Sequence, residues 1–438
     1  MTYPEAIQYL ESFINYEKIP VYPYKESCKL ERIKGFLETV GNPQDSLRCI
    51  HIAGTKGKGS TAAFIAYILA SAGYKVGLYT SPHLVDFRER IRILEERPQD
   101  DFAGMILKEE LAGLAEKMKP AIENYSRDSQ HGELSFFEVY TALAYIYFKE
   151  KKSDFVVLET GLGGRLDATN VVNSLVCAIT PISYEHTQKL GSTLAEIATE
   201  KAGIIKDPCP LTVITAPQED EVMRVIRDKC AETKARLCEV GKDITYQKTA
   251  QGFNIKGAFA EYNDLKINLL GSHQLVNASV SVASIEALRL CDVNVSIDAI
   301  RSGLYNTRWP GRCEIISRTP LVVLDGAQNV ASSRALKEAV RENFRYQRLI
   351  LVLGISKDKD IKGICDELYD LADVVILTKA DNPRASEPEN LAGYFNGKAV
   401  HITNNIKEAK AKAYSLNKKE DLILACGSLF VVGEFRDV

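Results

Sequence analysis

Residues 46–73 read SLRCIHIAGTKGKGSTAAFIAYILASAG. The first part, residues 46–54, is short and largely apolar, which is typical of a buried strand. Residues 61–73 have the length and apolar content of a helix, and Gly73 suits the left-handed turn that ends many helices. A glycine-rich loop joins the two. This strand–loop–helix unit predicts the beginning of a parallel α/β sheet.

The loop GTKGKGS, Gly54–Ser60, predicts a phosphate-binding site. Glycines let the chain turn tightly, so backbone N–H groups and the N-terminus of the following helix can converge on an anion. Lys58 would reach the outer phosphates of ATP. Gly59 breaks the GxxxxGK[ST] spacing, so a flexible turn with solvated lysines is the alternative, but the flanking strand and helix favour ATP. The predicted nucleotide contacts are Gly54, Thr55, Gly57, Lys58, Gly59, Ser60 and Thr61.

The same alternation of strands and helices continues toward the C-terminus. Further buried strands are predicted at 75–80, 154–160, 175–180 and 211–215, and helices at 136–152 and 272–290. Between about 240 and 270 the apolar stretches become shorter and alternate, which predicts antiparallel strands at 252–259 and 265–271.

A second series begins after the Trp-Pro-Gly break in TRWPGRCEII. Strands are predicted at 321–327, 348–354, 373–378 and 421–427, with a helix at 332–343. The break at Thr307–Gly311 therefore predicts two α/β domains with mostly parallel sheets, residues 1–307 and 308–438.

Composition indicates a folded protein with no nucleic-acid or membrane partner. Hydrophobic residues make up 45% and charged residues 26% of the 438, and the formal charge of -3 gives no overall basic field. No apolar stretch approaches the roughly 20 residues that cross a bilayer, and the start MTYPEAIQYLESF does not resemble a signal peptide. Ten cysteines without a CxxC pair predict reduced, mostly buried thiols in the cytoplasm.

Polar residues follow the predicted strands at the edge where ligands of parallel sheets collect. Glu159 ends one strand, His186 follows the next, and Lys201 lies on the helix after that. A carboxylate and an imidazole there could complete the coordination of Mg²⁺. Each also has a plain structural alternative: a helix cap for Glu159, a hydrogen-bonded loop histidine for His186 and a solvated side chain for Lys201.

Four longer strings decide between these alternatives. They are GTKGKGS, YTSPHLVDFRERIRI, ETGLGGRLDATN and EHTQKLGSTLAEIATEKAGIIK. Further strings follow in order as GSHQLVNASVSVA, RWPGRCE, LDGAQN, GISKDKD, NPRA and GSLFVVGEFR. Together they closely resemble the folylpolyglutamate synthase and dihydrofolate synthase branch of the Mur ligase superfamily. The resemblance implies a Mur-ligase-like P-loop ATPase domain, a smaller C-terminal Rossmann-like domain and an active site between them.

The resemblance also implies roles for individual residues. Lys58 and its loop would hold the ATP phosphates. Ser81 and Glu159 would bind one Mg²⁺, and Glu159, His186 and Lys201 would form a second metal site. The lysine that matches Lys201 is carbamylated by CO₂ in relatives, which turns a cation into an anion with oxygen ligands.

Further family positions are expected near the nucleotide and near the pterin of the substrate. Those near the nucleotide are Asn277, Arg312 and Asp325. Those on the pterin side are Phe137, Arg165, Asp167 and Ala168. Phe137 could also be a core residue at the start of an apolar helix, and Asp167 could also be a helix cap.

Two positions depart from the family pattern. Gln328 stands where the family usually has the histidine of DGAHN, and glutamine forms hydrogen bonds but does not titrate near neutral pH. Glu185 stands where many relatives have aspartate, which preserves the charge at one methylene's greater reach.

The implied activity is an ADP-forming ligation of L-glutamate to dihydropteroate, to folates, or to both. The implied partners are these small molecules and ATP, and a monomer is expected. One alternative is a single one of these activities or another acceptor within the superfamily. RERIRI, GGRLDATN and PRA favour the folate branch over the cell-wall Mur ligases. Another alternative is an ATPase that switches conformation without forming a bond, which would need neither a second metal nor a modified lysine.

Overall fold

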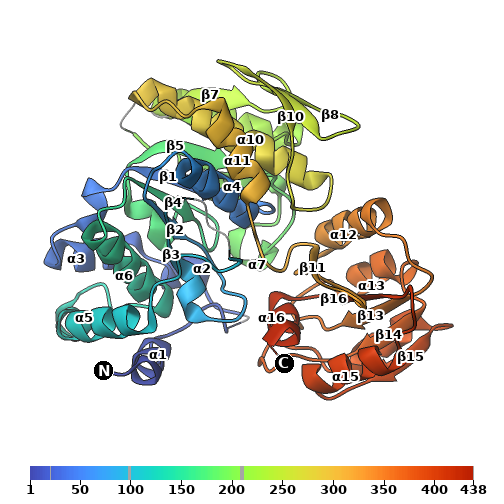
Figure 1. The fold of residues 1–438 in the computed structure, drawn as a ribbon. Helices are drawn as coiled ribbons and strands as arrows, with labels where there is room; N and C mark the ends of the chain where they lie inside the picture. Colours follow the sequence, from blue (N-terminus) through green and yellow to red (C-terminus); the bar gives the residue numbers. More distant parts are fainter. Residues whose placement is uncertain (20, 97–99, 208–211, 438) are drawn as a thin grey trace.

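A computed structural model of the chain describes residues 1–19, 21–96, 100–207 and 212–437. An N-terminal and a C-terminal α/β domain lie side by side in it (Figure 1). Within those ranges no helix is both long and apolar enough to span a membrane.

The sheet of the N-terminal domain has the strand order β3-β2-β4-β1-β5-β6-β7, and its neighbouring strands are parallel except for β2 and β3. The central strand β1 pairs with β4 and β5, and all of its residues are buried. The strand predicted at 211–215 is β6, of which residue 211 lies outside the described residues. The strands are β1 (Cys49–Ala53), β2 (Val76–Tyr79), β3 (Ile91–Leu94), β4 (Phe155–Glu159), β5 (Ser174–Ile179), β6 (Thr212–Thr215) and β7 (Arg236–Glu239).

Helices cover both faces of this sheet, as its buried strands require. One face carries α4 (Lys58–Ser71), α10 (His273–Ala287) and α11 (Ile297–Asn306). The other face carries α3 (Leu30–Thr39), α5 (Lys108–Asp128), α6 (Phe136–Glu150), α8 (Leu194–Ala202) and α9 (Asp220–Thr233). Short elements connect them: α1 (Tyr3–Glu11), α2 (Tyr24–Ser27), η1 (Pro43–Ser46), η2 (Phe87–Arg90), η3 (Ala168–Val171), α7 (Thr187–Leu190) and η4 (Leu288–Cys291).

The helix predicted from residue 61 begins three residues earlier, at Lys58. Gly57 adopts a left-handed conformation (φ 85°) and turns the chain into the helix. Lys58 and Gly59 therefore belong to the first helical turn and not to the loop. This turn carries the backbone N–H groups that have no partner within a helix.

A small antiparallel sheet of order β10-β9-β8 packs beside α10 and α11 at the top of Figure 1. Its strands are β8 (Thr245–Lys248), β9 (Phe253–Lys256) and β10 (Glu261–Leu265). The strand predicted at 265–271 was wrong, because β10 ends at Leu265. Asp264 has a φ of 55° and the register shifts between Tyr262 and Leu265, so the ladder breaks there. Beyond it Ile267 and Leu269 pack on the core without strand pairing.

The C-terminal domain has a sheet of order β11-β12-β16-β13-β14-β15, parallel except for β11 and β12. One face packs on α12 (Val330–Asn343) and α13 (Ile361–Tyr369), and the other on α15 (Ile406–Leu416) and α16 (Leu429–Asp437). The strands are β11 (Glu314–Arg318), β12 (Leu321–Leu324), β13 (Leu349–Leu353), β14 (Val374–Leu377), β15 (Ala399–Ile402) and β16 (Leu422–Cys426), and α14 (Glu389–Ala392) with η5 (Gly393–Phe395) precedes β15. The boundary at 307/308 stays a prediction.

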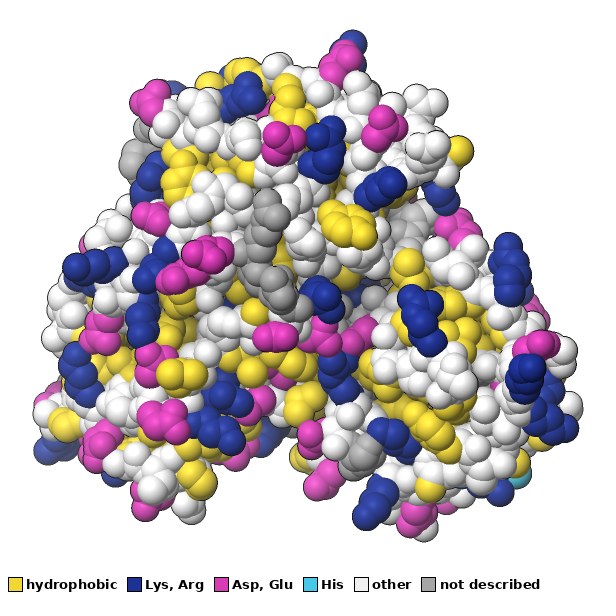
Figure 2. All heavy atoms as spheres, viewed as in Figure 1, with side chains coloured by type: hydrophobic (Ala, Val, Ile, Leu, Met, Phe, Trp, Pro, Cys, Tyr) yellow, Lys and Arg dark blue, Asp and Glu magenta, His cyan; other side chains and the backbone are white. Residues whose placement is uncertain are grey.

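In the view of Figure 2, the surface is hollowed between the two domains. Basic and acidic side chains gather at the upper end of this hollow. Residues at or after the carboxyl ends of β1, β4 and β5 line cavities together with residues of the C-terminal domain. Ligands of open parallel sheets bind at this edge.

Candidate active site

The phosphate loop runs from the end of β1 into α4, and its glycines are required by their surroundings. A Cβ atom on Gly54 (φ 148°) would lie 1.9 Å from Thr180 Oγ1, and one on Gly57 would lie 2.2 Å from Asn277 Oδ1. Gly57 offers no side-chain cap to α4. The N–H groups of the first turn are thus suited to bind an anion.

Helix α10 supports this loop from one side. Gln274 Nε2 donates a hydrogen bond to Ser60 Oγ (3.4 Å), and Asn277 Nδ2 donates one to Gln274 Oε1 (2.9 Å). The Thr61 hydroxyl is buried and has no hydrogen-bond partner among the described residues. Asn277 therefore lies against the loop, where a residue near the nucleotide was predicted.

Ser81 and Glu159 meet beside the loop. Ser81 follows β2, and its N–H donates to Glu159 Oε2 at the end of β4 (3.3 Å). Both line a cavity of about 50 Å³ together with Gly59 and Arg312. Burial raises the pKa of Glu159, while the positive charges of Lys58 and Arg312 oppose the rise. The predicted phosphate and metal residues thus share one edge of the sheet.

Asp325 orders the part of the C-terminal domain that faces this cavity. Its carboxylate accepts hydrogen bonds from the N–H groups of Cys313 and Ala327, both at 2.7 Å. Burial raises the pKa of Asp325, and the charge of Arg312 opposes that rise. The carboxylate holds the chain on both sides of itself, and so fixes the turns that carry Arg312 and Gln328.

Lys201 lies behind the phosphate loop. Its Nζ donates to the Gly54 carbonyl (2.7 Å), and the side chain is buried. Burial, reinforced by the charge of Lys58, lowers the pKa of Lys201 to about 7. Among the described residues no three His, Cys, Asp or Glu side chains are arranged to hold a metal ion. The second metal site therefore stays a prediction, and it requires the oxygen atoms that carbamylation would add to Lys201.

His186 lies at the N-terminal end of α7 and lines a second, larger cavity of about 200 Å³. Burial lowers the pKa of His186 to about 3, so its imidazole is neutral, as a metal ligand requires. Phe137 and Ala168 line the same cavity, with Gln328 on the opposite, C-terminal side. Tyr16, Tyr22 and Tyr24 also line this cavity and form an aromatic wall. They were missed by sequence reasoning, because they lie in none of the motifs that it used.

Of the predicted pterin-side residues Asp167 and Arg165, only Asp167 lines the larger cavity. Asp167 lines the larger cavity and also accepts a hydrogen bond from Thr169 N (3.0 Å), so it is both a cavity residue and the cap of η3. Burial raises the pKa of Asp167. Arg165 is not among the residues that line the cavity, and its guanidinium pairs with Glu200 (2.8 Å). Its predicted substrate contact would require the side chain to turn.

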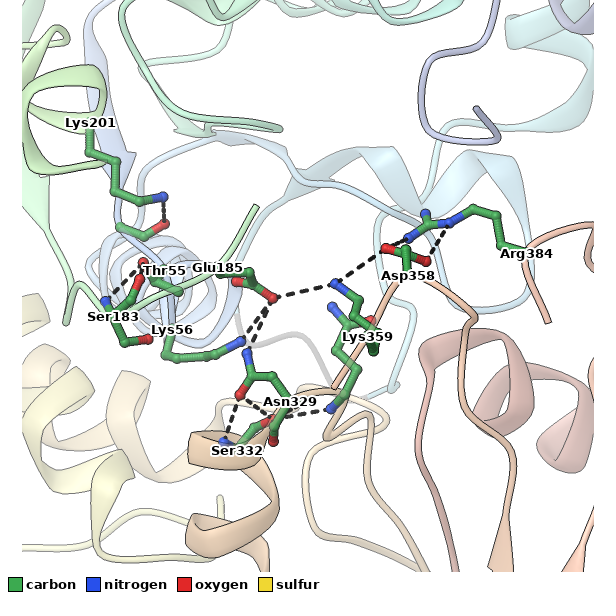
Figure 3. A network of polar contacts seen from close by, with 12 residues as sticks. Thr55, Lys56, Ser183, Glu185, Lys201, Asn329, Ser332, Asp358, Lys359 and Arg384 are labelled. Atoms are coloured by element: carbon green, nitrogen blue, oxygen red, sulfur yellow. Dashed lines mark hydrogen bonds and ion pairs between the residues drawn. The ribbon is translucent and has the colours of Figure 1, made fainter. Parts of the chain in front are cut away.

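A polar network across the hollow was missed by sequence reasoning (Figure 3). Glu185 lies at its centre, between Lys56 of the phosphate loop and Asn329 and Lys359 of the C-terminal domain. Burial by itself would raise the pKa of Glu185, but the positive charges of Lys56 and other neighbours hold it well below its ordinary value. The charged strings were visible in the sequence, but only the fold brings them together.

The chain is similar to known proteins over most of its length. Residues 108–285 match the Mur ligase middle domain, and residues 311–429 match the Mur ligase glutamate ligase domain. The dihydrofolate synthase/folylpolyglutamate synthase of Bacillus subtilis is 36% identical over 93% of this chain and 94% of its own length.

Solved structures show the same fold. Folylpolyglutamate synthase from Mycobacterium tuberculosis in complex with ADP superposes with a TM-score of 0.89, at 31% identity over 99% of this chain and 97% of that one. Escherichia coli FolC in complex with DHPP and ADP gives 0.84, at 29% identity over 100% and 97%. The chain therefore belongs to the folylpolyglutamate synthase and dihydrofolate synthase family of the Mur ligase superfamily.

Proposed function

We propose that this protein joins L-glutamate to dihydropteroate and to folates that already carry glutamate, in an ATP-dependent, ADP-forming ligation. The observation that carries the proposal is the wall that the two cavities share. Ser81, Pro82 and Leu429 line both the small cavity beside the phosphate loop and the larger cavity with the aromatic wall. A flat ring system held in the larger cavity could thus present its carboxylate at Ser81, next to the ATP phosphates.

The ligation needs an activated carboxylate, because a carboxylate does not react with an amine at neutral pH. A carboxylate oxygen of the acceptor attacks the γ-phosphorus of ATP, and ADP leaves. The amine of L-glutamate then attacks the carbon of the acyl phosphate, and phosphate departs with that oxygen. Lys58 and the first-turn N–H groups of α4 offset the charge on the transferring group. The C-terminal domain covers the site and excludes water, which would hydrolyse the acyl phosphate.

Mg²⁺ fits the residues beside the phosphate loop. The Ser81 hydroxyl and the Glu159 carboxylate offer the oxygen ligands that Mg²⁺ prefers, and both line the small cavity. Glu159, His186 and a carbamylated Lys201 would hold a second ion. When bound there, Mg²⁺ would supply positive charge to the phosphates and help to orient the γ-phosphoryl group.

Carbamylation of Lys201 is supported by its surroundings. Only a neutral amine adds CO₂, and the buried position beside Lys58 favours loss of the ammonium proton. The product is an anion, which the neighbouring cations Lys58 and Lys56 would stabilise. We further propose a cytoplasmic monomer whose partners are small molecules only, because a formal charge of -3 gives the chain no overall basic field for nucleic acid.

ADP release by the purified protein tests the proposal. With ATP and Mg²⁺, ADP should form when L-glutamate is supplied with dihydropteroate or with tetrahydrofolate, and should depend on both the acceptor and the amino acid. Turnover with only one acceptor would assign a single activity. ADP release that continues unchanged without L-glutamate would contradict ligation and indicate a nucleotide-driven switch.

A further inference from the structure

The segment Pro181–Glu185 after β5 is fastened along the phosphate loop. The N–H groups of Thr55 and Lys56 donate to the Pro181 carbonyl at 3.0 and 3.1 Å. Thr55 Oγ1 donates to the Ser183 carbonyl and accepts from the Ser183 N–H, both at 3.1 Å. These bonds run in both directions, so the loop and the segment form one unit (Figure 3).

Glu185 extends from the end of this unit into the C-terminal domain. Its Oε1 atom accepts from Lys56 Nζ at 3.1 Å and from Asn329 Nδ2 at 3.2 Å. Lys359 Nζ lies 3.8 Å from the same atom. One carboxylate oxygen thus faces a donor of the phosphate loop and two donors of the other domain.

The two donors of the C-terminal domain are held in place independently. The side-chain oxygen of Asn329 caps α12 by accepting from Ser332 N (2.9 Å), which leaves its NH₂ group directed at Glu185. The Lys359 side chain is only 8% exposed, and its Nζ also lies 3.9 Å from the carboxylate of Asp358. Because both donors are fixed within the C-terminal domain, their distances to Glu185 depend on where that domain lies.

We propose that Glu185 is a positioning residue that couples the phosphate loop to the C-terminal domain, through Lys56 on one side and Asn329 and Lys359 on the other. The proposal rests on the proposed function, since it gives bound nucleotide a way to stabilise the C-terminal domain over the site where ligation takes place. It concerns a contact between domains and not a ligand of the metal or of the substrate.

The coupling works through competition for Lys56. Phosphates bound in the loop attract the Lys56 ammonium, which then contributes less to Glu185. The carboxylate then interacts more strongly with Asn329 and Lys359, which stabilises the start of α12 beside the loop. Gln328 precedes Asn329 and lines the larger cavity. The position of the start of α12 therefore also sets the wall of that cavity, beside which we place the incoming L-glutamate.

Glu185→Gln tests this coupling, with Glu342→Gln as the matched control. Glu342 also bridges the two domains, to Lys248 at 3.4 Å, but at the far end of α12 and with both side chains exposed. Hydrogen exchange of the amides of residues 328–333 is measured with and without β,γ-methylene ATP, together with the affinity for that nucleotide. In the wild type and in Glu342→Gln, nucleotide should slow this exchange by about tenfold.

In Glu185→Gln the nucleotide should bind within about threefold of the wild-type affinity, yet slow the exchange less than about twofold. Loss of a charged hydrogen-bond network of this kind should raise KM for L-glutamate about 10- to 100-fold while KM for ATP changes little. Lys359→Gln should reproduce both effects, and the double variant should be no worse than either single one. Lys359→Gln also serves if Glu185→Gln does not fold.

Unchanged nucleotide-dependent exchange in Glu185→Gln, or no nucleotide effect in the wild type, would overturn the coupling. Failure of the proposed function is distinguishable from this result. A wild type that releases no ADP with either acceptor contradicts the ligation, whereas the exchange of residues 328–333 still reports on Glu185.

Discussion

Gly57 shows at the scale of one residue why the phosphate loop needs glycine. Its backbone is left-handed, and a side chain would overlap Asn277. The sequence predicted the loop from its glycines, but Asn277 comes from α10, which lies far along the chain. The left-handed backbone of Gly57 and its close contact with Asn277 both require glycine, but the contact exists only in the folded chain.

Gly57→Ala should weaken ADP binding by at least about tenfold, because left-handed strain of about 1–2 kcal/mol adds to the clash with Asn277. Isothermal titration calorimetry measures this loss. Gly73→Ala is the matched control, since Gly73 is also left-handed (φ 90°) but a Cβ atom there would meet no described atom within 4 Å. Equal losses in both variants would contradict a specific role for the loop.

Lys201 should carry a carbamate when CO₂ is present. With ¹³C-bicarbonate, the wild type should show a carbamate carbon signal in NMR that Lys201→Arg lacks. The pKa of Lys201 is lowered to about 7, so the neutral amine that reacts increases as pH rises through 7 and the signal should increase with it. A signal of equal size in Lys201→Arg, or none in the wild type, would refute carbamylation at this residue.

At the scale of elements, continuous apolar runs predicted the buried strands of both sheets well. Strand β4 ends at Glu159 as predicted, because its buried residues Phe155–Leu158 are all apolar and the first charged residue follows them. The alternation at 265–271 misled the prediction, since an extended segment that packs on the core has the same pattern as a paired strand. The start of α4 was missed for another reason: Lys58 and Gly59 are ordinary loop residues until Gly57 turns the chain.

Close packing of α11 on α4 depends on Gly303. A Cβ atom there would lie 2.3 Å from Ile68 Cα, which is backbone and cannot yield as a flexible side chain would. Gly303→Ala should therefore destabilise the protein by about 1–3 kcal/mol through overpacking. Gly113→Ala, in the exposed face of α5 with no described atom within 4 Å of the added carbon, should stabilise it by about 0.5–1 kcal/mol through helix propensity. Urea midpoints that move together would show that crowding is not the cause.

At the scale of the whole molecule, the candidate site belongs to neither domain alone. The sequence predicted the two α/β domains and, through the resemblance, the cleft between them. It did not predict the contact of Glu185 with Asn329, because these residues are 144 positions apart and each carries a common polar side chain. Such contacts follow from the placement of whole domains, which local patterns do not encode.

Isotope transfer tests most directly whether ATP and the acceptor carboxylate meet in this one site. Dihydropteroate with ¹⁸O in its carboxylate is incubated with the enzyme, ATP, Mg²⁺ and L-glutamate, and the released phosphate is analysed by mass spectrometry. Attack of that carboxylate on the γ-phosphorus leaves one carboxylate oxygen in each phosphate, so the label should appear there. Amide product accompanied by unlabelled phosphate would contradict the account.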